Sequence, residues 1–300
     1  MPMDTLQTSL DGLMIGSTYA LIGIGFALVF GIMRRINLAF GACLLFGASL
    51  AIYLEPWLGW GVWGLFLVTM VGAALASAYV ERLCFAPHTK RTQSMTAMIA
   101  SFAIWMQLDE ISSQMLPQRT HAYHGLEMPT FWLGEISVRG DQLLHFCMAL
   151  VSIMLLYVLL YKTRLGLLIR ATADNPETAH LLGVRVPWLG FIIFLLAGIL
   201  GGVGAFMILS ADGYITPMFG LWSTFKGLLA MILGGLGSLP GAVIGGLILG
   251  VVETHAGAAL GAEYRDIVTF GLVFLVLIIR PGGLMGVKIY RTDSLAQERT

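Results

Sequence analysis

The stretch that decides the fold runs from Lys162 to Pro187 and reads KTRLGLLIRATADNPETAHLLGVRVP. It is a polar, basic island between two apolar runs, at 142–161 and 188–209. Each run has about 20 residues, the length that a helix needs to cross the hydrocarbon core of a bilayer. The island therefore interrupts a membrane protein, and it is longer than a simple reversal of chain direction requires.

The second half of the island carries the signals of a short helix. Asn175 can cap a helix start, Pro176 suits the first helical position, and Glu177 suits the positive end of the helix dipole. Gly183 suits the position just past the last turn. These signals predict a helix of about two turns over 176–182, PETAHLL.

Composition agrees with a membrane protein. The chain has 300 residues, of which 57% are hydrophobic and 11% charged, whereas a soluble domain carries about 25% charge. Its 37 glycines suit helices that approach closely in lipid. The net charge of zero gives no reason to expect nucleic acid. The cysteines share no metal-binding spacing and are expected to be small buried hydrophobic residues: Cys43, Cys84 and Cys147.

Apolar runs predict the other membrane helices, at about 10–33, 38–54, 61–83, 94–115, 142–161, 188–209 and 265–280. Before the last of these, two further runs, 222–236 and 241–254, are separated by GGLGSLPG. Each has about 14 residues, roughly 21 Å of helix against a core of about 30 Å, so they either cross in short, tilted form or dip part-way as a hairpin. We predict an all-α membrane protein, a single domain over 1–300 with about eight transmembrane helices, two of them short or broken.

Positive charge predicts the orientation, because cytoplasmic segments are enriched in Lys and Arg. With the N-terminus outside, the cytoplasmic segments hold Arg34, Arg35, Arg82, Lys90, Arg91, Lys162, Arg164, Arg170, Arg185, Arg280, Lys288, Arg291 and Arg299. The outer segments hold Arg119, Arg139 and Arg265, and Lys226 lies within a span. We therefore predict an N-out, C-in arrangement with the island in the cytoplasm.

The island has two interpretations. We expect a second helical stretch, 165–173, to continue from the preceding span, so the island can fold back on its own helices. Alternatively, the helix over 176–182 presents Leu181 and Leu182 to a groove on a soluble partner. His180 has no second histidine nearby and is expected at a surface or interface.

The glycine-rich break at 234–241 is a candidate functional feature. It lacks the Gly-Lys-Ser/Thr ending of a phosphate-binding loop, and its flanks are apolar spans. Broken helices expose backbone groups, which a bilayer tolerates where they line a cavity or are buried in protein. Ser238 can cap the second half-helix, whose N-terminus could then face a substrate carboxylate, and tight glycine packing is the alternative.

Lys226 and Glu253 are charged residues within or at the ends of apolar runs. Such residues are costly in lipid and face the bundle interior or a water-filled path, unless they extend to the interface. The two could pair with each other. The spacing Gly12-x-x-x-Gly16 favours close helix contact, either within the chain or with a second membrane subunit.

Several stretches together resemble the H-type permease subunits of ABC importers for branched-chain amino acids. The island matches the cytoplasmic coupling pattern of that family at Arg170, Ala173, Asn175, Ala179, Leu181 and Gly183. The runs Gly16–Gly41, Ala230–Glu253 and Glu263–Gly286 are similar to its first span and turn, its glycine-rich hairpin, and its final span and tail. One departure is Phe40, where the family usually has His, which leaves Asn37 as the polar residue of that turn.

The resemblance implies a multi-pass subunit of the bacterial inner membrane. It implies a second, M-type permease, two cytoplasmic ATPases, a periplasmic binding protein and membrane lipid as partners. The chain itself would bind no cofactor, since ATP would be bound by the ATPases. The island residues expected to couple to the ATPases are Arg170, Ala173, Asn175, Glu177, Ala179, Leu181, Leu182 and Gly183. The residues expected along the translocation pathway are Ser17, Tyr19, Asn37, Lys226, Ser238 and Glu253.

Other function classes find less support. The six histidines do not cluster, and the sequence shows no HExxH and no paired acid and base, so neither an enzyme nor a metal site is predicted. A self-sufficient secondary transporter would need coupling carboxylates within the spans, for which Glu253 is the candidate. Within the family, urea, amides or another small solute are alternative substrates.

Overall fold

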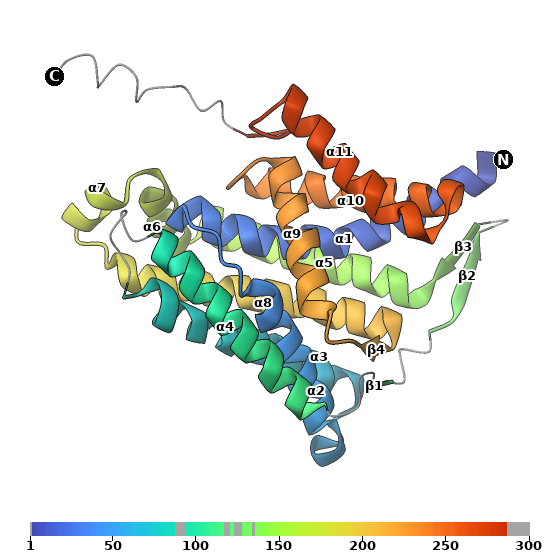
Figure 1. Ribbon diagram of the computed structural model, residues 1–300, viewed down its shortest axis with the longest axis horizontal. Coiled ribbons are helices and arrows are strands. Elements are labelled where there is room, and N and C mark those ends of the chain that lie inside the picture. Colours follow the sequence, from blue (N-terminus) through green and yellow to red (C-terminus); the bar gives the residue numbers. More distant parts are fainter. Residues whose placement is uncertain (1, 88–93, 117–120, 123–127, 134–135, 287–300) are drawn as a thin grey trace.

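A computed structural model describes residues 2–87, 94–116, 121–122, 128–133 and 136–286. The fold is mainly helical, as predicted (Figure 1). Before the island come α1 (Pro2–Met33), α2 (Phe40–Leu58), α3 (Gly61–Val80), α4 (Ser94–Met115) and α5 (Gly140–Lys162). The island forms α6 (Arg164–Asp174) and α7 (Pro176–Leu181), and α8 (Val186–Asp212), α9 (Phe219–Gly234), α10 (Leu239–Leu260) and α11 (Arg265–Ile279) follow.

Four short strands are seen in the described residues, and β2 and β3 lie at the end of the molecule that holds the N-terminus, whereas β1 and β4 lie lower in the view (Figure 1). β2 (Thr130–Leu133) and β3 (Ile136–Arg139), which precede α5 in the sequence, pair antiparallel, with Thr130 opposite Arg139. β1 (His121–Ala122) pairs antiparallel with β4 (Tyr214–Ile215) just after α8. The side chain of Gln7 holds α1 to this region, because it donates to the carbonyl of Ser137 at 2.8 Å and accepts from its amide at 3.1 Å.

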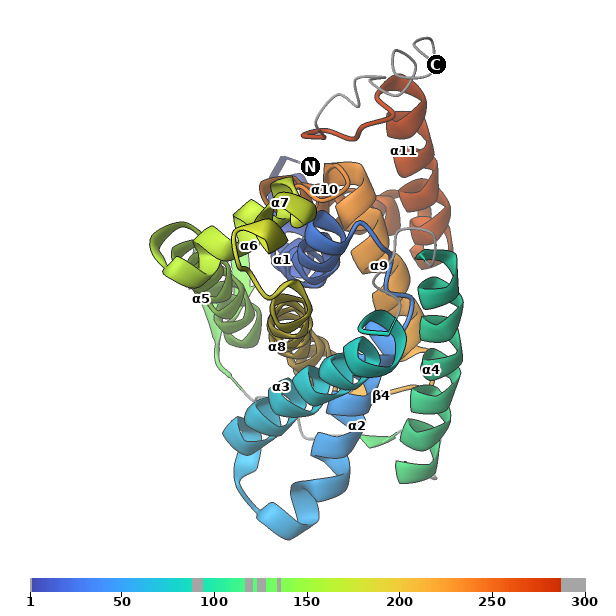
Figure 2. The ribbon, with the colours of Figure 1, turned by 90° about the vertical axis from the view of Figure 1, so that its left-hand side faces the viewer.

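The opposite end, called here the α7 end, carries α6, α7, the α1–α2 connection and the α9–α10 connection (Figure 1). Figure 2 looks from this end and shows α1 enclosed by α5, α8, α9 and α10, with which it is in contact. Helices α2 and α3 pack on α8, α2 also packs on α9, and α4 packs on α2. Helix α11 packs on α9 and α10. The core lies along α8, whose Phe194 and Phe206 are fully buried.

Six helices of the described part are long and apolar enough to cross a membrane: α1, α2, α3 extended by a π-helical turn (Glu81–Phe85), α5, α8 and α10. Helix α9, with 16 residues, is shorter. The expectation of two runs of about 14 residues in 222–254 was wrong for the second run. Helix α10 has 22 residues and continues past Glu253 to Leu260. Glu253 is paired with Lys226, so its carboxylate can lie inside the bundle.

The expectation that the stretch 165–173 continues the preceding span was also wrong. Thr163, at φ −113° and ψ 159°, is extended and ends α5. Its hydroxyl accepts a hydrogen bond from the amide of Gly166, so it also caps the new helix α6. The change of direction follows from this cap, which offers the backbone an alternative to continued helix.

The closest helix pair is α1 with α10, which run antiparallel. Gly12 lies against Val251 and Gly16 against Leu247, so residue numbers increase along α1 as they decrease along α10. A Cβ atom on Gly250 would lie 2.3 Å from the Cα atom of Gly16, which is closer than any side chain tolerates. The face of α1 that carries Gly12 and Gly16 therefore packs against α10 of the same chain, and it is not available to a second subunit.

Candidate functional site

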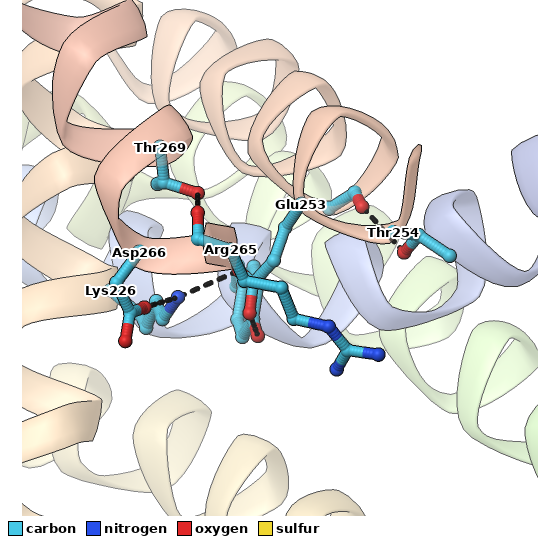
Figure 3. Close-up of polar contacts among 8 residues, drawn as sticks. Lys226, Glu253, Thr254, Arg265, Asp266 and Thr269 are labelled. Carbon is cyan, nitrogen blue, oxygen red and sulfur yellow. Dashed lines mark hydrogen bonds and ion pairs between the residues drawn. The ribbon is translucent and has the colours of Figure 1, made fainter. Parts of the chain in front are cut away.

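A largely buried ion-pair cluster joins three helices. Lys226 on α9 is 8% exposed. Its Nζ atom lies 2.7 Å from Oε2 of Glu253 on α10 and 3.1 Å from Oδ1 of Asp266 on α11 (Figure 3). A buried ammonium group is costly unless it is paired and hydrogen-bonded. The carboxylates of Glu253 and Asp266 offset that cost by pairing with the ammonium group. The cluster therefore links α9, α10 and α11.

Tyr19 adds the fourth helix, α1, to this cluster. Its hydroxyl donates to Oε1 of Glu253 at 3.3 Å, and the Nζ atom of Lys226 lies 5.5 Å from the centre of its ring. Both contacts favour the charged forms of the pair, the first by a hydrogen bond and the second by the negative face of the ring. We call Tyr19, Lys226, Glu253 and Asp266 the Lys226 cluster.

The Lys226 cluster forms one wall of a large cavity of about 580 Å³. The cavity lies toward the end opposite α7, among the middle of α1, the first turns of α5, α9 and α11 and the last turns of α8 and α10. Its apolar walls include Ile15, Ile22, Met207, Ile208, Phe219 and Trp222. Volume and mixed lining are those of a site for a small molecule, for which about 300–1,000 Å³ is usual.

Further polar groups line the large cavity at its α5 and α8 walls. Arg139 and Asp141 form an ion pair at 2.5 Å, just where α5 begins. His145 on α5 contacts the hydroxyl of Ser210 on α8 at 2.7 Å. This pair is not arranged as a nucleophile and its base. The hydroxyl of Ser210 donates its proton to the carbonyl of Phe206 at 2.9 Å, and Asp141, which could orient His145, is paired with Arg139 instead.

A small cavity of about 240 Å³ lies at the α7 end. It is enclosed by Gly31 at the end of α1, by Arg170 and Ala173 of α6, and by Gly237 and Ser238 of the α9–α10 connection. Ser238 caps α10 as predicted, since its hydroxyl accepts from the amide of Gly241 at 3.2 Å. The island thus faces the break between α9 and α10 directly.

Helix α7 has the predicted cap and ends. The side chain of Asn175 accepts from the amides of Glu177 at 3.1 Å and Thr178 at 3.0 Å, and Gly183 has φ +88° just after the helix. Ala179 faces inward and is 2% exposed, whereas Leu181 and Leu182 are 85% and 79% exposed. The tip of α7 therefore presents two neighbouring leucines that no described residue covers.

Residues 8–277 match the sequence profile of the family described as branched-chain amino acid transport system / permease component. The chain belongs to this family. The permease is 31% identical over 294 residues to the high-affinity branched-chain amino acid permease protein LivH of Escherichia coli K12, covering 94% of this chain and 95% of that one. Its identity to BraD of Pseudomonas aeruginosa, of the same description, is 33% over 296 residues, with the same shares covered.

Two comparisons are more distant. The nucleoside ABC transporter permease protein NupC of Lactococcus lactis is 32% identical over 164 residues, which is 50% of the permease and 51% of NupC. Among solved structures, PsaBC from Streptococcus pneumoniae in complex with Fab aligns with a TM-score of 0.49 and 15% identity, covering 91% of each chain.

The permease brings three of the predicted pathway residues together and leaves three apart. Tyr19, Lys226 and Glu253 meet in the Lys226 cluster. Ser17 is buried and donates to the carbonyl of Met14 at 2.6 Å, away from the cavity lining. Ser238 lines the small cavity at the α7 end. Asn37 is buried in the α1–α2 connection, where its side-chain oxygen accepts from the amide of Ala39 at 3.1 Å.

Sequence reasoning missed the carboxylates of Asp212 and Asp266, which line the large cavity of the permease. Asp212 ends α8 and Asp266 is the second residue of α11, so each stands at the end of a span, where a charged residue is common and draws no attention. Arg265 was counted only as an outer charge, and it also lines the cavity. The signal available was weak, because the contact of Asp266 with Lys226 joins residues 40 positions apart.

Phe40, at the position where the family usually has His, is a buried packing residue. Its ring is 1% exposed and meets Phe26 edge-on, with the ring centres 4.7 Å apart. It lies against Gly25 and Gly201, where an added Cβ would come within 2.5 Å and 2.7 Å of its ring. In this permease the position is therefore a packing wedge between α1 and α8.

Proposed function

We propose that the permease is the H-type membrane subunit of an ATP-driven ABC importer that carries branched-chain or related hydrophobic amino acids across the bacterial inner membrane. The likeness to LivH and BraD along nearly the whole chain supports this substrate class. The observation that carries the mechanism is the tip of α7, where Leu181 and Leu182 are exposed beside a well-capped helix. An exposed apolar pair on a folded polar segment is suited to insertion in a groove of a soluble protein.

The orientation proposed is N-out and C-in, with about eight spans. Arg34, Arg82, Arg170 and Arg280 all belong to segments at the α7 end, which is what the positive-inside tendency favours for the cytoplasmic side. The large cavity then opens toward the outer side. There it can receive a solute from a periplasmic binding protein.

Energy enters from other subunits in this proposal. The permease itself would be non-catalytic and bind no cofactor, and ATP would be bound by the ATPases; the sequence contains no Gly-x-x-x-x-Gly-Lys-Ser/Thr. Two cytoplasmic ATPases would dock on α6 and α7 through Arg170, Leu181 and Leu182, and a second, M-type permease would complete the path. Closure of the ATPases would push α6, which shares the small cavity with the α9–α10 connection, and α9 and α10 carry Lys226 and Glu253.

A second candidate is ion-coupled secondary transport, which the buried Lys226–Glu253 pair favours, because membrane carboxylates serve as coupling sites in such proteins. Among ABC importers, another small solute such as urea or an amide is the alternative, and NupC is a nucleoside permease by its description. Gradient-driven uptake by the permease alone, in vesicles without ATPase, would select the secondary transporter.

The test replaces both leucines of the α7 tip. The variant Leu181→Asp/Leu182→Asp is produced with the partner subunits, and capture of the ATPase and ATP-driven uptake of leucine into vesicles are measured. Burial of each leucine is worth about 1.5–3 kcal/mol, so capture should weaken at least about tenfold. Leu260→Asp is the matched control, since Leu260 is 58% exposed at the end of α10, away from α7. Normal capture and uptake by the double variant would refute the docking role.

A further inference from the structure

The large cavity contains charges of both signs. Its lining includes three cations and four carboxylates, which gives 3 − 4 = −1 with His145 neutral: Arg139, Lys226, Arg265, Asp141, Asp212, Glu253 and Asp266. Seven ionisable groups around one cavity are too many for an inert packing defect, since each must be solvated or paired. Their pairing therefore decides what the cavity can bind.

Five of the seven charges are already committed. Arg139 is paired with Asp141, and Lys226 is shared between Glu253 and Asp266. Within the described part of the chain, the side chains of Asp212 and Arg265 make no hydrogen bond or ion pair, and both are exposed to the cavity. Figure 3 shows the guanidinium group of Arg265 directed away from the Lys226 cluster, with no contact drawn to it.

The helix ends that carry these two residues have matching polarity. Asp212 is the last residue of α8, where the unpaired carbonyls add negative potential that favours a cation. Arg265 is the first residue of α11, where the helix dipole favours an anion. One cavity thus offers a free carboxylate and a free guanidinium, each reinforced by its helix, beside an apolar wall that includes Ile15 and Phe219.

We propose that the large cavity holds a subsite for a zwitterionic solute, in which Arg265 binds the carboxylate and Asp212 binds the ammonium group. This inference rests on the proposed function and names the residues that would recognise the backbone of the amino acid. Lys226 does not bind the substrate carboxylate in this scheme, because Glu253 and Asp266 already neutralise it. The Lys226 cluster instead fixes α1, α9, α10 and α11 around the subsite.

The test measures solute binding to the cavity without the binding protein, whose own selectivity would hide that of the permease. A cysteine reporter is placed in the lining by Thr254→Cys, in a background where the exposed Cys147 is replaced by Ser. The purified importer in nanodiscs is treated with a neutral maleimide. The slowing of the reaction by a solute reports its binding, and Cys43 and Cys84 are buried and contribute little.

Three probes separate the two charges: leucine, leucine amide, which lacks the carboxylate, and 4-methylpentanoate, which lacks the ammonium group. Leucine should protect the reporter at a concentration at least about tenfold lower than either analogue, since a hydrogen bond to a charged group is worth about one factor of ten or more. With Arg265→Gln, protection by leucine should fall to that of leucine amide, whose own protection stays unchanged. With Asp212→Asn it should fall to that of 4-methylpentanoate.

Two charge-neutralising controls lie outside the cavity lining. Glu263→Gln, in the turn before α11, and Arg280→Gln, at the other end of that helix, should leave all three protection curves unchanged. Unchanged protection by leucine amide in the Arg265→Gln variant also shows that the cavity is still folded. Equal protection by leucine in the parent, Arg265→Gln and Asp212→Asn importers would overturn the subsite.

Two further outcomes are decisive. If the charge variants weaken capture of the binding protein and leave protection by leucine intact, Arg265 and Asp212 belong to a protein-docking rim and the subsite is refuted. If the parent importer takes up leucine with ATP but leucine gives no protection, the subsite fails while the proposed function stands. Absence of ATP-driven uptake of any branched-chain amino acid by the parent would instead refute the proposed substrate class.

Discussion

The Nζ atom of Lys226 lies 2.7 Å from the Oε2 atom of Glu253, and these side chains are only 10% and 12% exposed. The two residues come from consecutive helices that reverse direction at the α7 end, so their contact closes the opposite part of the α9–α10 hairpin. Removal of one charge leaves the other buried. This asymmetry, more than the strength of the pair, makes the contact sensitive to substitution.

We expect Glu253→Gln to destabilise the permease by about 2–3 kcal/mol, because Lys226 then keeps only the partly exposed Asp266 as a charged partner. The double variant Lys226→Met/Glu253→Gln should recover part of that loss, since it leaves no buried ammonium group. Thermal unfolding in detergent measures both. Equal unfolding temperatures for the parent and the single variant would contradict the role given to the pair.

The α1–α10 contact predicts that Gly250→Ala is costly. The new methyl group would lie 2.3 Å from the Cα and N atoms of Gly16, both main-chain atoms that cannot rotate away. Overpacking of this kind costs about 1–3 kcal/mol. Gly271→Ala on α11 is the matched control, since nothing lies within 4 Å of its Cβ position, and it should be neutral or stabilising. A smaller loss for Gly250→Ala than for Gly271→Ala in thermal unfolding would overturn the packing argument.

Loss of the Asn175 cap should loosen α7 without unfolding the protein. Asn175→Ala removes the acceptor for the amides of Glu177 and Thr178 at a cost of about 1 kcal/mol, or about fivefold in local opening. Hydrogen exchange of the α7 amides should accelerate by that factor, and exchange in α8 should not change. Asn175→Asp and Asn175→Ser keep an acceptor and should restore slow exchange. Unaltered exchange in the alanine variant would show that the cap is dispensable.

Phe40 should behave as a core residue. Phe40→Ala removes the ring between Gly25 and Gly201 and should cost about 3–5 kcal/mol. Phe40→His should cost less than the alanine change but remain destabilising, because the side chains around it, such as Phe26 and Leu44, offer no polar partner. Unfolding temperatures in detergent rank the three proteins. A histidine variant as stable as the parent would show an unrecognised hydrogen-bond partner.

Local signals in the sequence predicted local structure well. Asn175, Pro176 and Gly183 gave the start and end of α7, and Ser238 the cap of α10, because each acts on backbone groups within three residues of itself. The boundaries of apolar runs were less reliable. The run ending at Glu253 was too short, since no sequence window shows that a lysine 27 positions away neutralises this carboxylate.

The candidate site was less predictable than the fold. The pairing of Lys226 with Glu253 could be raised only as a possibility, and the contributions of Asp266, Asp212 and Arg265 depend on which helix ends meet in space. The partner of Gly12 and Gly16 was equally open, because small residues indicate a close approach without naming the surface that approaches. Several charges used for orientation, including Lys90, Arg119, Lys288, Arg291 and Arg299, lie outside the described residues.

The bare leucines at the tip of α7 also matter for how the protein is made. Leu181 and Leu182 are exposed until another surface covers them, and an exposed apolar pair favours self-association. When this chain is produced without its partners, we therefore expect it to aggregate and to be degraded. Simultaneous synthesis of a protein that shields the pair should raise the yield, and so should replacement of both leucines by glutamine.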